Sequence, residues 1–224
     1  MKRTERHHLK DNELNPLALS ERRMMEARKG LIQGLLIAMV VAGVGAIGYY
    51  AWRARAENRA YSLLAEATIV EETTVGPPAD PTASDTSARF PTVQAKAEAA
   101  AAKYKAVAEG YPSTDAGLFA AYREGATLML LNQPAQAATA FQRVVDRDAD
   151  GLYGRMARMG LAEAQARAGQ FDQAIAAYKA LAERQDDALP LDGILMQLGR
   201  TYVSAGKRAE AQQTFNRIVQ EFPE

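Results

Sequence analysis

Few side chains in this sequence are of a type that carries out chemistry. Its 224 residues include no cysteine and only two histidines, His7 and His8. Imidazole is the base that activates serine and cysteine nucleophiles, and thiolate and imidazole are common zinc ligands. The rest of the chain therefore lacks Ser-His and Cys-His catalysis and imidazole zinc sites. The two histidines have no third ligand nearby, and we interpret them as part of a solvated tail rather than a metal site.

One acidic run has the spacing of a metal loop. The run Asp146-Arg147-Asp148-Ala149-Asp150-Gly151 matches the first half of a calcium loop, whose oxygens come from alternate positions. The twelfth position, which should be a bidentate Glu, is Ala157. We therefore favour an acidic link between structural units over a calcium site. With no metal, cofactor or catalytic residue indicated, we do not expect an enzyme.

The regular feature of the sequence is a ladder of aromatic residues 37 positions apart. Its rungs are Tyr104, Phe141, Tyr178 and Phe215. A small residue precedes each rung by four positions, and an aliphatic residue follows it by three: Ala100, Ala137, Ala174 and Ala211; Val107, Val144, Leu181 and Ile218. This spacing places all three residues on one face of a helix. The pattern predicts the same helix four times.

A second apolar-periodic segment precedes three of these helices. These segments are residues 117–131, 154–168 and 192–205, and each ends in a link at Asn132, Gly169 or Gly206. Asparagine and glycine tolerate the left-handed backbone that ends many helices. The repeating unit is therefore predicted to be a helix hairpin, and the fold an all-α solenoid whose hairpins bury their faces by stacking.

The hairpin sequence resembles the tetratricopeptide repeat. The last unit shows the family's pattern most fully, with Gly199, Tyr202, Gly206, Ala211, Phe215 and Pro223. The family commonly repeats every 34 residues, so a period of 37 implies longer helices or links. The resemblance implies about three and a half repeats and a protein-binding function.

In this family the first helix of each hairpin lines a concave groove. Matching the sequence to the family turn by turn assigns these positions to the groove: Phe119, Tyr122, Met129, Met156, Met159, Glu163, Met196, Arg200 and Val203. Methionine is flexible and polarizable, so a methionine-lined groove adapts to different apolar segments. The alternative is that these are ordinary core residues at helical spacing.

An apolar segment near the N-terminus predicts a membrane anchor. Residues 30–52 are 23 residues without a charge, about 34 Å as a helix and enough to cross a hydrocarbon core. A cleaved signal peptide is the alternative, because Ala54-Arg55-Ala56 has the form of a cleavage site. We favour a retained anchor, since the apolar stretch and the arm before it are too long for a signal peptide. Eight basic residues precede the span, which places the N-terminus in the cytoplasm and the repeats outside.

Small residues recur at every fourth position of this span. Gly30, Gly34, Ala38, Ala42 and Ala46 form one smooth stripe along which another helix can pack closely. Small residues are also common in membrane helices that have no such partner.

The remaining segments follow from composition. Residues 1–29 form a polar cytoplasmic arm with a helix break expected at Pro16, and 53–74 an outward helix that supplies the first half of the first hairpin. Residues 75–91 are a proline-rich flexible loop, and 92–224 the repeat domain. Lys and Arg balance Asp and Glu at 27 each, so charge does not indicate nucleic-acid binding.

This layout resembles the YfgM-like ancillary subunits of the bacterial Sec translocon. That resemblance implies an inner-membrane protein with periplasmic repeats, with translocon subunits and periplasmic chaperones as partners. The leading hypothesis is a membrane-anchored adaptor or chaperone that binds apolar polypeptide segments. The alternative is a scaffold for envelope assembly or polysaccharide export, which binds one folded partner or a second copy through Ile218, Val219 and Phe222 at the solenoid end.

Overall fold

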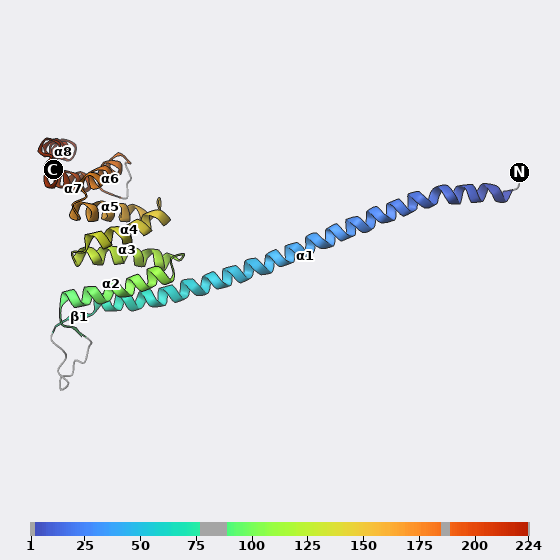
Figure 1. Cartoon of the computed structure of the whole chain (residues 1–224), viewed down its shortest axis with the longest axis horizontal. Coiled ribbons are helices and arrows are strands. Elements are labelled where there is room, and N and C mark those ends of the chain that lie inside the picture. Colours follow the sequence, from blue (N-terminus) through green and yellow to red (C-terminus); the bar gives the residue numbers. More distant parts are fainter. Residues whose placement is uncertain (1–2, 77–88, 185–188, 224) are drawn as a thin grey trace, which may run out of the picture. The chain divides into compact units, whose positions relative to one another are not determined.

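The computed structural model describes residues 3–76, 89–184 and 189–223, with side chains from residue 28 onward except at 89. The described residues form eight helices and one pair of very short strands (Figure 1). In chain order these are α1 (Arg3–Glu72), β1 (Thr74–Val75), β2 (Arg89–Phe90), α2 (Val93–Gly110), α3 (Asp115–Leu130), α4 (Pro134–Arg147), α5 (Leu152–Arg167), α6 (Phe171–Glu183), α7 (Leu191–Ser204) and α8 (Arg208–Glu221). The chain divides into two compact units, Met1–Arg55 and Ala56–Glu224.

The first unit consists of the long N-terminal part of α1. The break expected at Pro16 was wrong, because α1 is continuous from Arg3. A proline removes one backbone hydrogen bond and can kink a helix without ending it. From residue 28 to 55 every side chain is exposed, including the large apolar residues of the predicted span.

By length and hydropathy, one helix among the described residues is a candidate to cross a membrane. It is the part of α1 from residue 28 to 72, with a mean hydropathy of 2.2 over its most apolar window. A signal sequence near the N-terminus has the same properties. The candidate cleavage site, 54–56, lies within α1.

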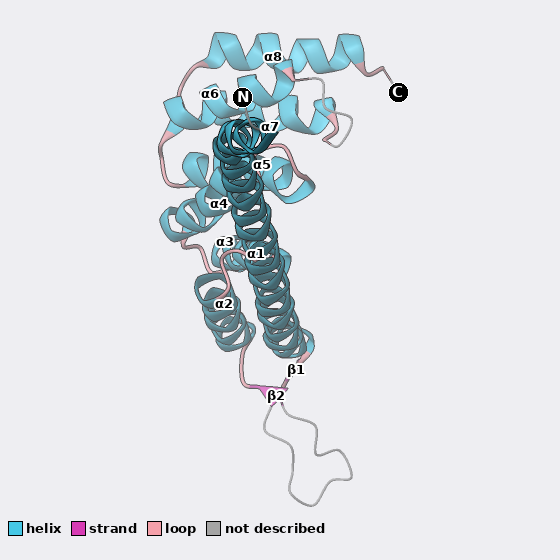
Figure 2. Ribbon diagram, turned by 90° about the vertical axis from the view of Figure 1, so that its right-hand side faces the viewer, coloured by secondary structure: helices cyan, strands magenta, loops and turns pink. Residues whose placement is uncertain are grey.

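The second unit is a stack of four helix hairpins (Figure 2). Three of them pair α3 with α4, α5 with α6 and α7 with α8. The first pairs the C-terminal part of α1 with α2, as expected from the sequence. Ala60, Leu64 and Ala67 of α1 share one buried cluster with Ala100 and Tyr104 of α2. The outward helix is therefore part of the repeat solenoid.

The links within the later hairpins share one geometry. Asn132, Gly169 and Gly206 have φ values of 55°, 79° and 75°, as the sequence predicted. The residue after each link donates its backbone N–H to a carbonyl five residues earlier, at 2.9 Å in all three cases. This bond satisfies a carbonyl group that would otherwise be unpaired at the end of the first helix.

The aromatic ladder forms the core of the solenoid. Tyr104, Phe141 and Tyr178 are buried, and Phe215 in the last hairpin is half-buried. The glycines of the first helices make room for these rings. A Cβ atom added at Gly125 or Gly160 would lie 2.8 or 2.6 Å from the Phe141 ring. One phenyl ring thus fills the space between α3, α4 and α5.

The strand pair is the one departure from an all-helical fold in the described residues. Thr74 and Val75 pair in parallel with Arg89 and Phe90, whereas the sequence predicted no strand. Two residues are too few for an alternating pattern to be visible. The proline-rich segment is bracketed by these strands, and its residues 77–88 lie outside the described part of the chain.

Candidate functional site

The first helices of successive hairpins form one side of the solenoid. Helix α3 contacts α5, and α5 contacts α7. The described second helices, α2, α4, α6 and α8, do not pack against one another to the same extent. A solenoid whose first helices lie closer together than its second helices curves toward the first helices. The inner side is therefore lined by α3, α5 and α7, as the predicted groove requires.

The predicted groove residues lie on the more accessible side of these helices. Phe119, Tyr122 and Met129 of α3 are half-buried, opposite the fully buried Ala120, Glu124 and Leu128 face. On α5 and α7 the half-buried positions are Met156, Met159, Glu163 and Met196, and the exposed ones are Arg200 and Val203.

Several groove residues also contact the core. Phe119, Tyr122 and Met129 pack against the first buried cluster, and Met159 packs against the second. The sequence left open whether these are groove residues or core residues. In the structure each of these side chains contacts the core with one part and remains accessible with another. Glu163 is held on this surface by Arg167, at 2.6 Å.

Two tyrosines that the sequence did not identify, Tyr61 of α1 and Tyr153 of α5, accompany Phe119 and Tyr122 of this surface. Tyr153, at the start of α5, lies 5.4 Å from Phe119 and 6.3 Å from Tyr122, measured between ring centroids. Tyr61 of α1 is 51% exposed and is close enough to Tyr153 for the two to interact electrostatically. We call Tyr61, Phe119, Tyr122 and Tyr153 the aromatic patch.

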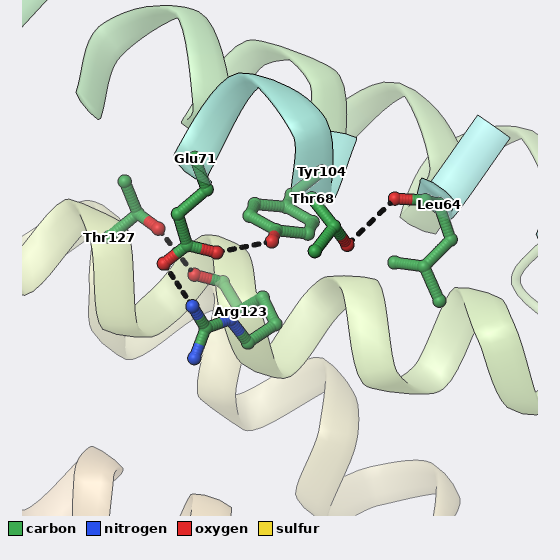
Figure 3. Close-up of polar contacts among 6 residues, drawn as sticks. All are labelled: Leu64, Thr68, Glu71, Tyr104, Arg123 and Thr127. Carbon is green, nitrogen blue, oxygen red and sulfur yellow. Dashed lines mark hydrogen bonds and ion pairs between the residues drawn. The ribbon is translucent and has the colours of Figure 1, made fainter. Parts of the chain in front are cut away.

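A polar network joins the first two hairpins (Figure 3). Glu71 of α1 accepts a hydrogen bond from the Tyr104 hydroxyl at 2.5 Å. The same carboxylate forms an ion pair with Arg123 of α3. The Arg123 guanidinium also lies over the Tyr104 ring, 5.8 Å from its centroid. Partial burial favours a higher pKa for Glu71, but the bonds from Arg123 and Tyr104 outweigh it and lower that pKa.

A second ion pair connects α3 and α4. The Glu124 carboxylate is almost fully buried and accepts a bond from Arg143 at 2.6 Å. Burial raises the pKa of Glu124, and Arg143 offsets this only in part. The Nε atom of the same guanidinium is buried without a hydrogen-bond partner among the described residues.

Arg143 also lines three hollows that lie outside the predicted groove. Two of them, of about 310 and 490 Å³, lie between α2 and α4, with Ala108 and Pro112 in both walls. The third, of about 460 Å³, is lined by α4, Leu161 and Gln165. Such hollows are expected where the second helices diverge.

The carboxylates of the calcium-like run do not converge. Asp146 accepts a bond from Gln142 at 2.6 Å, Asp148 from the Gly154 backbone N–H at 3.2 Å, and Asp150 from Arg184 at 3.3 Å. Within the described residues no three His, Cys, Asp or Glu side chains are grouped as metal ligands. The side chains of His7 and His8 lie outside that description.

The two other predicted surfaces are accessible. The stripe Gly30, Gly34, Ala38, Ala42 and Ala46 is exposed along α1. At the solenoid end, Val219 is 72% and Phe222 40% exposed, and Ile218 is half-buried.

A model of the tetratricopeptide repeat family matches three segments of the chain, 119–150, 156–188 and 194–224. The chain contains tetratricopeptide repeats. The matched segments correspond to the last three hairpins, while the hairpin of α1 and α2 precedes them. The tetratricopeptide fold is typically a protein-binding scaffold rather than a catalytic one.

Solved structures of tetratricopeptide proteins are similar to part of the chain. A variant of the nearly identical TPR-like repeats of a Podosopora anserina kinesin light chain is 18% identical, with a TM-score of 0.49. MamA from Desulfovibrio magneticus RS-1 is 19% identical, with a TM-score of 0.47. Each match covers 55% of this chain and 65% of the other. YrrB, a TPR protein with an unusual peptide-binding site, is 20% identical over 59% of this chain and 70% of its own, with a TM-score of 0.42. No curated protein matches the chain.

Proposed function

We propose that this protein is a membrane-anchored adaptor or chaperone that binds apolar polypeptide segments along the inner side of α3, α5 and α7. The observation that carries the proposal is the half-buried row of aromatic and methionine side chains on that side, from Phe119 to Met196. Half-buried apolar side chains are held in place by the core and still offer surface to a ligand. Their flexibility suits segments of differing sequence.

The proposal also places the protein at a membrane. The exposed apolar stretch of α1 from residue 30 to 52 supports an anchor, because such a surface is stable only in lipid or against another protein. The basic residues before it support a cytoplasmic N-terminus and repeats on the far side of the membrane. In this arrangement the repeats meet newly exported chains, with Sec translocon subunits and periplasmic chaperones as the proposed partners.

A pair of charge substitutions tests the groove. In the full chain, Met159→Glu combined with Met196→Glu puts two carboxylates on the inner side, where they should abolish binding of fluorescent apolar peptides. Ala176→Glu with Gln212→Glu adds the same charge to exposed positions of α6 and α8 and should leave binding unchanged. Unaltered peptide binding by the methionine variant, with its helical circular dichroism intact, would refute the groove.

The solenoid end supports a second candidate function, a scaffold that binds one folded partner. Its basis is the exposure of Val219 on α8 and of Phe222 directly after it. A scaffold should lose its partner on Val219→Glu and bind few unrelated peptides, whereas a chaperone should bind many of them and tolerate that change.

A further inference from the structure

The aromatic patch is accompanied by two carboxylates. Glu57 lies four residues before Tyr61 on α1, and Asp115 lies four residues before Phe119 on α3, so each acid shares a helix face with a ring of the patch. The Glu57 carboxylate is held in place by the start of α3, where it accepts the backbone N–H of Asp115 at 3.1 Å and of Ala116 at 3.2 Å. The two acids are therefore neighbours beside the patch.

Four basic side chains of the same helices have partners or positions away from the rings. Arg123 binds Glu71. On α5, Arg155 donates to the Asp150 carbonyl at 2.7 Å and Arg158 lies 3.9 Å from the Asp150 carboxylate. Arg59 of α1 is two residues from Tyr61, which puts it on nearly the opposite side of that helix.

The charged groups that act on Tyr61 of the patch are both acids. Neither Glu57 nor Asp115 forms an ion pair with a described residue. Burial and then the charges of Glu57 and Asp115 raise the pKa of Tyr61. The faces of aromatic rings attract cations as well, so the rings and the carboxylates favour the same kind of group.

We propose that the aromatic patch binds an arginine or lysine side chain of the partner, so that the preferred polypeptide carries a basic residue next to its apolar ones. This rests on the proposed function and adds charge selectivity to it. The apolar part of the segment would lie toward Met156, Met159 and Met196, and the cation against the rings of Tyr61 and Tyr153. Charge complementarity, rather than shape alone, then sets which end of the groove the basic residue occupies.

Two peptides that differ only in charge test this inference. Both have the same leucines and phenylalanines, and one carries two arginines where the other carries two citrullines, which are similar in shape and uncharged. Fluorescence anisotropy with the full chain in lipid nanodiscs measures Kd for each. We expect the arginine peptide to bind about tenfold more tightly at low ionic strength, with the difference shrinking as salt is added.

Variants assign this preference to the patch. Asp115→Asn and Tyr61→Leu should each reduce the preference for arginine by about threefold or more, while the affinity for the citrulline peptide stays the same. Glu183→Gln removes an exposed acid from α6 and should change neither affinity. Asp115→Asn is the decisive variant if Tyr61→Leu disturbs the fold.

The outcomes separate this inference from the proposed function. Equal binding of both peptides by the native chain would overturn charge selectivity and leave the groove standing. Binding of neither peptide would overturn both. A preference for arginine that survives in both variants would place the cation site away from the aromatic patch and refute the assignment.

Discussion

Glu71 connects three helices, because it lies on α1 and binds Tyr104 of α2 and Arg123 of α3. Replacing it with glutamine keeps the shape and removes the charge. We expect Glu71→Gln to lower the free energy of unfolding by about 1–2 kcal/mol at pH 7. Urea denaturation of the full chain, followed by circular dichroism, measures this loss.

The loss should depend on pH. The pKa of Glu71 is lowered in the folded chain, so its charge stabilises the fold above the ordinary glutamate pKa. That contribution disappears as the pH falls through the lowered pKa, and the variant should then approach the native chain in stability. Glu66→Gln is the matched control, because Glu66 on the same helix pairs with Lys103 at 2.9 Å while half-exposed, and should cost less than about 1 kcal/mol. An unchanged difference at low pH would contradict the assigned role.

The Phe141 ring leaves no room for a methyl group at Gly160. A Cβ atom there would lie 2.6 Å from the ring, so Gly160→Ala should destabilise the chain by about 1–3 kcal/mol through overpacking. Gly110→Ala is the control, since nothing lies within 4 Å of the added atom and alanine favours the helix. Thermal unfolding measures the stability of both variants, and an equal change in the two would contradict overpacking at Gly160.

A double-mutant cycle identifies the ring as the cause. Phe141→Leu replaces the ring with a smaller side chain. Gly160→Ala should therefore lower the free energy of unfolding less in the Phe141→Leu background than in the native chain. Additive losses in the double variant would show that the alanine disturbs something other than the ring.

The core residues could be predicted from the sequence, but part of the candidate site could not. The ladder from Tyr104 to Phe215 repeats every 37 residues. Such a repeat identifies the buried face of each helix even when the helices that pack against it are unknown. Tyr61 and Tyr153 do not belong to that pattern. They lie within electrostatic range of each other only in the folded chain, and the sequence spacing between them carries no sign of it.

At the scale of elements, the links between helices depend on left-handed backbone. Gly169 has a φ of 79°. Gly169→Ala should lower the free energy of unfolding of the chain by about 1 kcal/mol, because the added Cβ atom disfavours that conformation. Asn132, with φ of 55°, should tolerate glycine almost without loss. Chemical denaturation compares the two, and equal losses would contradict a conformational cause.

The helices were easier to predict than the strands or the ends of α1. Each repeat helix combines an apolar stripe with a link residue, so its existence and approximate bounds follow from the pattern. The pair of β1 and β2 arises from backbone contacts between residues that are distant in sequence, and no local pattern predicts such a contact. In α1, Pro16 suggested an end where the helix continues, because one missing hydrogen bond does not outweigh the helical preference on both sides.

At the scale of the repeat unit, the stacking of the hairpins decides where grooves and hollows form. The first helices approach one another and carry the aromatic and methionine side chains, while the second helices diverge and leave the hollows around Arg143. The family register assigned the predicted groove to the first of these surfaces. It did not predict the second, because the hollows result from the angle between hairpins rather than from residue types.

At the scale of the whole chain, the absence of native cysteine allows a direct test of the proposed anchor. Ser20→Cys and Ser113→Cys each introduce the only thiol of the chain, on either side of residues 30–52. A retained span with a cytoplasmic N-terminus predicts that a membrane-impermeant maleimide labels intact cells only at position 113, and position 20 only after the membrane is permeabilised. The mass of the purified protein distinguishes a retained anchor from a cleaved signal peptide, because cleavage after Ala56 would leave a chain that begins at Glu57. Labelling of position 20 in intact cells would refute the cytoplasmic N-terminus, and a chain of that shorter mass would refute the retained anchor. Neither outcome would affect the proposed groove, which lies within the unit Ala56–Glu224.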